Sequence, residues 1–208
     1  EIPSRCKRTA QADWISAMDI DFLRNVSLFK GLNEEGLKAL SELCFTREFA
    51  KEGVIILAEQ EGDTLFIIQE GQVKVCISSE EGREVILSLL GPGSVFGELA
   101  LLDGKLRSAN VIATDATSLV MLRRSDFQQL IYKTPEIAMA LLAELAGRLR
   151  RTDRQIEGLA LLDVTSRISE TLLQLADDQG KETAEGIAID SRPTHQELAN
   201  MSGTTRET

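Results

Sequence analysis

The sequence is poor in the residues that metal and redox sites use. Its 208 residues include three cysteines and one histidine, and no two cysteines have a C-x-x-C spacing. A disulfide framework, a zinc ribbon and a four-cysteine iron–sulfur cluster all need more ligands than this. With His195 as the only histidine, most histidine-based acid–base catalysis is excluded as well. We therefore expect no metal site and no enzyme, in a protein of the reducing cytoplasm.

Long apolar segments are also missing. The longest uninterrupted apolar run is Ile137–Ala143, which is seven residues, whereas a membrane-spanning helix needs roughly 20. No basic segment followed by an apolar one opens the chain, so we expect no secretory signal and no membrane partner.

Basic and aromatic residues are too few for a protein that coats nucleic acid with its whole surface. Lysine and arginine number 23 against 33 acidic residues, so the net charge is −10. One tryptophan, one tyrosine and seven phenylalanines leave little for stacking on single-stranded bases. A local basic face that binds duplex DNA remains possible on this composition.

The hydrophobic pattern divides the chain into segments of different character. Residues 1–24 carry mixed charge and are expected to form an N-terminal arm. Asn25–Leu43 has helical spacing, with Asn33-Glu34-Glu35 as a helix-start signal. From Phe45 to Arg123, short apolar runs alternate with glycine-containing turns, which predicts an antiparallel sandwich or barrel. After Ser125 the period becomes helical.

A heptad seam runs through this second half. Its positions, alternately four and three residues apart, are Ala138, Leu142, Leu145, Leu149, Thr152, Ile156 and Leu159. Such a seam usually faces a partner helix, most simply in a second copy of the chain, although the stripe could pack on its own β domain. Thr152 is the polar position of the seam. A polar residue there can fix the register of the helices or have a separate function, or it can simply be tolerated. Asp153 is surrounded by arginines, namely Arg148, Arg150, Arg151 and Arg154. They suggest a bound anion nearby, although they could also form a solvent-exposed charged face.

The C-terminal segment has the signals of a helix-turn-helix. Asp163 is a helix cap before Val164–Ala176, and Asp177–Gly186 is polar and loop-like. Thr194–Glu197 and Thr204–Glu207 each match a capping box, with the turn Ser202-Gly203 before the second.

Gly97–Leu102, followed by Arg107-Ser108-Ala109, has the residues of a sugar-phosphate site. Glycine lets the backbone approach a ligand and leaves N–H groups free to point at it. Arg107 offers a planar fork for phosphate and Ser108 a hydroxyl. Glu98 can accept from a sugar hydroxyl, and a carboxylate so near Arg107 is expected to form an ion pair with it.

These motifs resemble those of the CRP/FNR family of transcription regulators over roughly residues 25–208. Phe96–Ala109 is similar to the phosphate-binding cassette of cyclic-nucleotide-binding domains, Leu159–Ile168 to the family's dimer-helix end and hinge, and Thr194–Thr208 to the first half of its helix-turn-helix. The resemblance implies an α+β fold. It has a β-roll or jelly-roll domain over 25–124, a dimerisation helix over 125–162 and a winged helix-turn-helix over 163–208 that continues beyond Thr208.

The resemblance also implies roles for individual residues. Glu98 would hold the ribose 2′-hydroxyl of a cyclic nucleotide, most simply cyclic AMP, and Thr152 its purine amino group. Asp153 stands where cyclic-AMP-responsive members have a serine that reaches the partner subunit's ligand. Arg107 and Ser108 would hold the cyclic phosphate, with Gly97, Leu99 and Ala109 next to them in the site. Arg148 would be the partner of Glu98.

The same resemblance implies operator DNA and RNA polymerase as partners of a homodimer joined through helix 138–159, with Asp163 as the hinge. The DNA contacts would be Thr194, Gln196 and Thr205, with Arg206 and Glu207 reading bases.

Three alternatives stay open. The first is a regulator of the same fold that responds to another nucleotide or to none; Asp153 and a loop one residue shorter between Glu98 and Arg107 keep the nucleotide open. The second is a regulatory module of a larger signalling protein, which would explain the cassette but not Thr194–Thr208. The third is an enzyme, for which no nucleophile or metal cage is evident.

Overall fold

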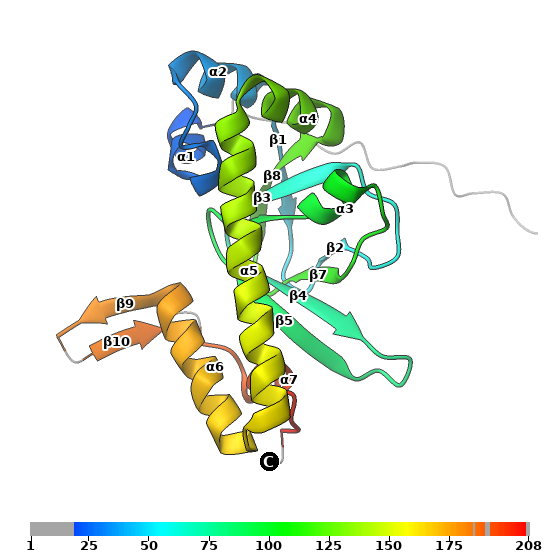
Figure 1. Cartoon of the computed structure of the whole chain (residues 1–208), viewed down its shortest axis with the longest axis vertical. Helices are drawn as coiled ribbons and strands as arrows, with labels where there is room; N and C mark the ends of the chain where they lie inside the picture. The colour runs from blue at the N-terminus through cyan, green and yellow to red at the C-terminus, as the bar shows by residue number, and fades with distance from the viewer. Residues whose placement is uncertain (1–18, 185, 190–191, 207–208) are drawn as a thin grey trace, which may run out of the picture.

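The computed structural model describes residues 19–184, 186–189 and 192–206. It has a β domain, a long helix that runs beside this domain, and a smaller C-terminal unit at the far end of that helix (Figure 1). Most of the arm expected over residues 1–24, and Glu207 among the expected DNA contacts, lie outside the described residues.

The β domain is a sandwich of two four-stranded sheets. One sheet has the order β1-β8-β3-β6, formed by Phe45–Phe49, Thr117–Arg123, Thr64–Glu70 and Val95–Phe96. The other has the order β2-β7-β4-β5, formed by Val54–Ile56, Asn110–Ala113, Val73–Ser78 and Glu84–Leu90. Every pairing is antiparallel, and side chains from both sheets, such as Phe66, Ile68, Val73 and Val111, form the core between them. The predicted antiparallel sandwich is confirmed.

Three short helices cover one end of the sandwich. They are α1 (Ile20–Asn25), a 3₁₀ turn (Ser27–Phe29) and α2 (Glu34–Leu43), so the single helix expected over Asn25–Leu43 is wrong. The start signal lies inside that range, because the Asn33 side chain accepts a hydrogen bond from the backbone N–H of Gly36 and caps α2. The end of the expected arm, α1, places Leu23 in a core that also contains Phe29 and Phe127.

The long helix is α5 (Pro135–Leu161), preceded by α4 (Arg124–Lys133). Its first turns pack on the β domain through Ile137 and Leu141. Four seam residues further along are more than half exposed in the single chain: Leu142, Leu149, Ile156 and Leu159. Packing of the stripe on the chain's own β domain therefore does not hold for these four. Within the described residues, no helix is both long and apolar enough to cross a membrane.

The C-terminal unit begins with α6 (Val164–Gln179), whose N-terminus is capped by the Asp163 carboxylate at the Ser166 N–H. The hairpin β9 (Gly180–Thr183) and β10 (Gly186–Ile189) follows, so the segment expected as a loop over 177–186 is a helix end and strands. Helix α7 (His195–Ser202) starts at the predicted capping box of Thr194 and Glu197 and ends at Gly203, which has a left-handed backbone.

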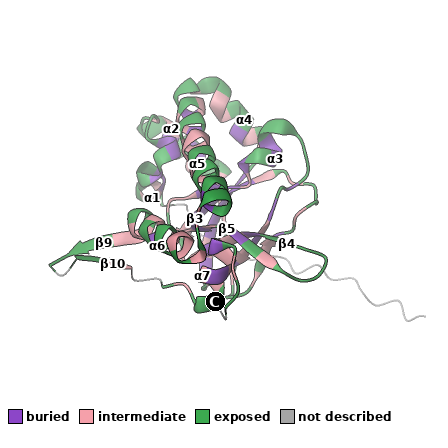
Figure 2. Ribbon diagram, turned by 60° about the horizontal axis from the view of Figure 1, so that its bottom comes forward, coloured by how far each residue is buried: buried purple, intermediate pink, exposed green. Residues whose placement is uncertain are grey.

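The C-terminal unit packs directly on the β domain, where α7 lies beside β5 of the β4–β5 hairpin (Figure 2). A third apolar cluster joins them, with Cys76, Ile86 and Leu89 of the sheet against Leu175 of α6 and, at its edge, Leu198 and Met201 of α7. Glu84 adds a polar link, since it accepts from Lys74 at 2.8 Å and from Asn200 of α7 at 3.3 Å. Burial raises the pKa of Glu84, but the hydrogen bond and charge of Lys74 outweigh it and leave the pKa below its ordinary value.

Candidate functional site

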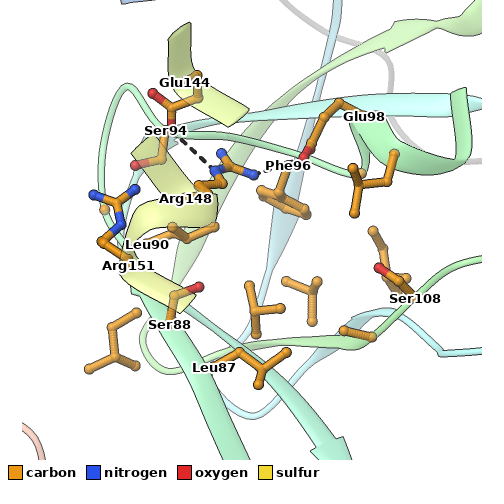
Figure 3. A pocket seen from close by; sticks show the side chains of 18 of the residues that line it. Leu87, Ser88, Leu90, Ser94, Phe96, Glu98, Ser108, Glu144, Arg148 and Arg151 are labelled. Carbon is orange, nitrogen blue, oxygen red and sulfur yellow. Dashed lines mark hydrogen bonds and ion pairs between the residues drawn. The ribbon is translucent and has the colours of Figure 1, made fainter. Parts of the chain in front are cut away.

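A cavity of about 890 Å³ lies between the β domain and α5 (Figure 3). Its walls come from β4, β5, α3 and the segment after α3, from the middle of α5 and from the end of α6. Of the residues predicted for the ligand site, it brings together Gly97, Glu98, Leu99, Arg107, Ser108, Ala109, Arg148 and Thr152. Residues that are 55 positions apart in the sequence thus share one concave surface of a size typical of small-molecule sites.

Helix α3 (Glu98–Asp103) carries the first of these residues into the cavity. Gly97 precedes it with φ of 79°, a left-handed conformation that side-chain-bearing residues rarely adopt. This turn points Glu98 inward, where it is only 3% exposed. A short helix therefore begins at Glu98, and the glycine before it is required by the backbone.

Glu98 is paired across the cavity wall with Arg148 of α5. Their ion pair is 2.9 Å long, and the Nε of Arg148 also donates to Glu144 at 3.2 Å, as the dashed lines of Figure 3 show. A further guanidinium bond goes to the backbone carbonyl of Val95. The pair of Glu98 with Arg148 that the family resemblance implies is present. The ion pair expected between Glu98 and Arg107 from their proximity is wrong, because Arg107 points to backbone carbonyls instead.

Arg107 is buried, at 7% exposure, with unusual partners. Its guanidinium donates to the carbonyl of Gly97 at 2.6 Å and to that of Thr64 at 2.8 Å, and it lies 5.7 Å from the centre of the Phe66 ring. Burial lowers the pKa of this guanidinium; the charges of Asp63 and Glu98 act in the opposite direction and that of Arg124 in the same one. A buried cation held by neutral carbonyls is well suited to an anionic ligand.

Two glycines make room for Arg107. A Cβ atom on Gly97 would come within 2.6 Å of the guanidinium, and a Cβ on Gly62 would lie 1.9 Å from its Nε. Sequence reasoning treated Gly62 only as a turn between strands. Nothing local marks it as part of the site, because it acts on a side chain 45 positions away.

Replacing Gly62 by alanine is expected to displace the Arg107 side chain, because the new methyl group would occupy the space of the guanidinium. Overpacking of this kind costs about 1–3 kcal/mol of folding free energy. Nucleotide affinity should fall about tenfold or more, measured by calorimetric titration. Gly147→Ala in α5 is the control, since nothing lies within 4 Å of its added Cβ and its backbone is not left-handed. Equal nucleotide affinity in the two variants would contradict the role given to Gly62.

The other predicted ligand residues differ in position. Ser108 is exposed at the cavity and lies across it from Arg151 in Figure 3, while Ala109 is buried. Thr152 lines the cavity and its hydroxyl donates to the carbonyl of Arg148 at 3.1 Å. Asp153 is exposed and does not line the cavity of its own chain, so a contact with a partner subunit's ligand stays a prediction.

The predicted DNA contacts lie on α7 and the turn after it. Thr194 caps α7, while Gln196, Thr205 and Arg206 are exposed. Arg167 of α6, which sequence reasoning missed, holds this turn by donating to the carbonyl of Ser202 at 2.9 Å and to that of Leu162 at 3.0 Å. Its partners are backbone atoms distant in sequence, so the motif alone gives no signal for it.

Side chains that could ligate a metal do not gather in the part of the chain described: no group of three or more His, Cys, Asp or Glu is suitably placed there. Burial, together with a smaller effect of nearby carboxylates, raises the pKa of the Cys44 thiol to about 12 and that of Cys76 to about 11, so both thiols remain protonated at neutral pH.

Comparison with known proteins identifies two family domains in the chain. Residues 46–134 match the family model of the cyclic nucleotide-binding domain, and residues 166–208 match that of the Crp-like helix-turn-helix domain. The cAMP-activated global transcriptional regulator CRP of Pasteurella multocida is 38% identical over 167 residues, covering 79% of each chain. The CRP-like cAMP-activated global transcriptional regulator of Mycobacterium tuberculosis is 31% identical over 188 residues, covering 90% of this chain and 84% of its own.

Solved structures show the same architecture. The c-di-GMP responsive global regulator CLP of Xanthomonas campestris superimposes with a TM-score of 0.70 at 25% identity, covering 84% of this chain and 87% of its own. This chain thus has a cyclic nucleotide-binding domain followed by a Crp-like helix-turn-helix domain, and it matches its relatives over most of their length. The chain belongs to the CRP family of transcription regulators, which join a cyclic nucleotide-binding domain to a Crp-like helix-turn-helix.

Proposed function

We propose that the protein is a homodimeric regulator whose binding to operator DNA is switched by a cyclic nucleotide, most simply cyclic AMP, held between the β domain and α5. The observation that carries this proposal is Arg107. It is buried at the cavity wall, and in the described part of the chain its hydrogen bonds go to backbone carbonyls rather than to a carboxylate. A cyclic phosphate would supply the missing negative charge.

The other cavity residues fit the rest of the ligand. Ser108 offers a hydroxyl next to Arg107, and the Glu98 carboxylate, fixed by Arg148, is an acceptor for a ribose hydroxyl. Thr152 lies on the α5 wall, where it would meet the base. Because Glu98 keeps its ion pair with Arg148, it is held in place before the ligand arrives.

The dimer is supported by the exposed seam. Leu142, Leu149, Ile156 and Leu159 are apolar, regularly spaced and open to solvent in the single chain. A second copy packed along 138–159 would bury them as a coiled coil does. Thr152 belongs both to this seam and to the cavity wall, and it would therefore link the ligand to the dimer interface.

DNA binding is supported by the C-terminal unit, which matches a Crp-like helix-turn-helix domain and in which Arg206 is exposed. In a dimer, two such units would enter successive major grooves about 34 Å apart, with Glu207 beside Arg206 as a second base contact and Asp163 at the hinge. The family resemblance also implies RNA polymerase as a partner, and we propose a cytoplasmic location. A ligand shifts the equilibrium between two arrangements of the DNA-binding units only to the extent that it binds these arrangements with different affinity.

Another nucleotide is the second candidate. The P. multocida and M. tuberculosis relatives are named as cAMP-activated, whereas the X. campestris regulator is c-di-GMP responsive. Asp153 bears on which nucleotide binds, because a carboxylate at that position would repel a second phosphate group but would accept a hydrogen bond from a base. The deciding experiment is a calorimetric titration with cyclic AMP, cyclic GMP and cyclic di-GMP. Saturable one-to-one binding of cyclic AMP per chain supports the proposal, and binding of none of the three would overturn it.

Thr152→Ala should test the link between ligand and interface. We expect cyclic AMP affinity to fall about three- to tenfold, because one neutral hydrogen bond is lost. Operator binding by the full-length protein, measured by fluorescence anisotropy, should also lose most of its dependence on saturating cyclic AMP. Thr165→Ala, at an exposed position on α6, is the control. Unchanged ligand dependence in Thr152→Ala would contradict the link.

A further inference from the structure

Arg124 lies next to the phosphate-binding residues without lining the cavity. It is the first residue of α4, directly after β8. Its guanidinium donates to the carbonyl of Gly62 at 3.3 Å and to that of Ala100, and its backbone N–H donates to the carbonyl of Asp63 at 2.6 Å. Arg124 thus joins the Gly62–Asp63 segment to helix α3.

These two segments are the walls of the slot that holds Arg107. On one side, Gly62 is in such close contact with the Arg107 guanidinium that a Cβ atom would overlap it, and Thr64 accepts one of its hydrogen bonds. On the other side, Gly97 accepts a second hydrogen bond and begins α3, which contains Ala100. A side chain that bonds to both walls therefore fixes the width of the slot.

Arg124 is an unusual residue for this task. Its Nε is buried and has no hydrogen-bond partner within the described residues, although a buried donor without a partner is unfavourable. Its positive charge also acts on Arg107, so two guanidinium groups share this part of the domain. Neutral donors could join two carbonyls without this repulsion. The arrangement becomes favourable when an anion binds at Arg107, because both cations then act on it.

We propose that Arg124 is a positioning residue for the anionic part of the ligand: it holds the Gly62 segment and α3 at the spacing that aims Arg107 at a phosphate, and it adds a second positive charge behind it. This inference rests on the proposed nucleotide site. It assigns to Arg124 a role that depends on the phosphate of the ligand and not on its ribose or base.

The test compares cyclic AMP with adenosine, which keeps the ribose and base but has no phosphate. Arg124→Gln should raise the dissociation constant of cyclic AMP about tenfold, the effect of losing a charge-assisted contact, and leave that of adenosine within about twofold. Arg124→Lys keeps the charge but cannot bridge both carbonyls, so an intermediate loss is expected. The matched control is Arg123→Gln, an exposed neighbour with the same charge, which should change neither constant by more than about twofold.

The outcomes separate this inference from the proposed function. Equal weakening of cyclic AMP and adenosine would mean general damage to the domain and would overturn the positioning role, as would unchanged cyclic AMP affinity in Arg124→Gln. If thermal unfolding shows that Arg124→Gln does not fold, the affinities for cyclic AMP and adenosine are compared in Arg124→Lys instead, and the same outcomes apply. Failure of the unchanged chain to bind any cyclic nucleotide would overturn the proposed function and this inference together. Loss of binding in Arg107→Ala with full binding in both Arg124 variants would overturn the inference alone.

Discussion

Arg107→Ala is expected to abolish the response to cyclic AMP. The variant loses the planar guanidinium that would bind the phosphate. It also loses a positive charge that is buried, since Arg107 is only 7% exposed. Charge-assisted hydrogen bonds to phosphate are about twice as strong as neutral ones, so affinity should fall about a hundredfold or more. In a calorimetric titration the binding heat should disappear, and saturating cyclic AMP should no longer raise the unfolding temperature.

Two controls separate loss of the ligand contact from loss of the fold. Lys105→Ala removes a positive charge two residues away, where the side chain is 82% exposed and does not line the cavity. It should bind cyclic AMP normally. Arg107→Lys keeps the charge but not the fork, and we expect it to recover only part of the affinity. Full binding in Arg107→Ala would remove the observation on which the proposed function depends.

Substituting Leu142 and Leu149 together by glutamine is expected to convert the protein from a dimer to a monomer. Both side chains are more than half exposed in the single chain, so the substitutions should leave the fold of one subunit intact. In the proposed dimer each would be buried, and two-fold symmetry repeats every change. Losing a buried leucine costs about 2–5 kcal/mol, so four such losses would exceed the stability of most dimers. Light scattering after size-exclusion chromatography should show the mass fall by half.

Leu173→Gln provides the comparison. This leucine of α6 is 66% exposed, similar to Leu149, but it lies off the seam. It should leave the dimer unchanged. A dimer that persists in the double variant, or a monomeric unchanged chain at micromolar concentration, would show that the heptad seam serves another purpose.

Local sequence signals predicted much of the fold. Asn33, Asp163 and Thr194 were recognisable as helix caps, and each accepts the expected backbone N–H. The change from strand to helix period also lies where β8 ends and α4 begins. Capping and periodicity involve neighbours three or four positions apart, so they are written in the sequence itself. The helix predicted over Asn25–Leu43 forms only in its second half, as α2, while the first half contains the end of α1 and a 3₁₀ turn.

The cassette shows where sequence reasoning stops. Its residue types and order identified the cavity walls from Gly97 to Ala109, but proximity in sequence suggested the wrong partner for Glu98. The carboxylate pairs with Arg148, fifty positions away, because α5 packs across the opening of the sandwich. The same packing explains Gly62, whose importance depends on an arginine from a different loop.

The sequence by itself determined the kind of domain, the order of its parts and the residues that could hold a phosphate, because these depend on local spacing and residue chemistry. Only the tertiary structure decided that backbone carbonyls hold Arg107, which glycines make room for it, and that α7 packs on the β4–β5 hairpin beside Glu84. The physical reason is that ion pairs and close contacts form between surfaces brought together by burial of apolar side chains, and the spacing of residues along the chain does not fix those distances.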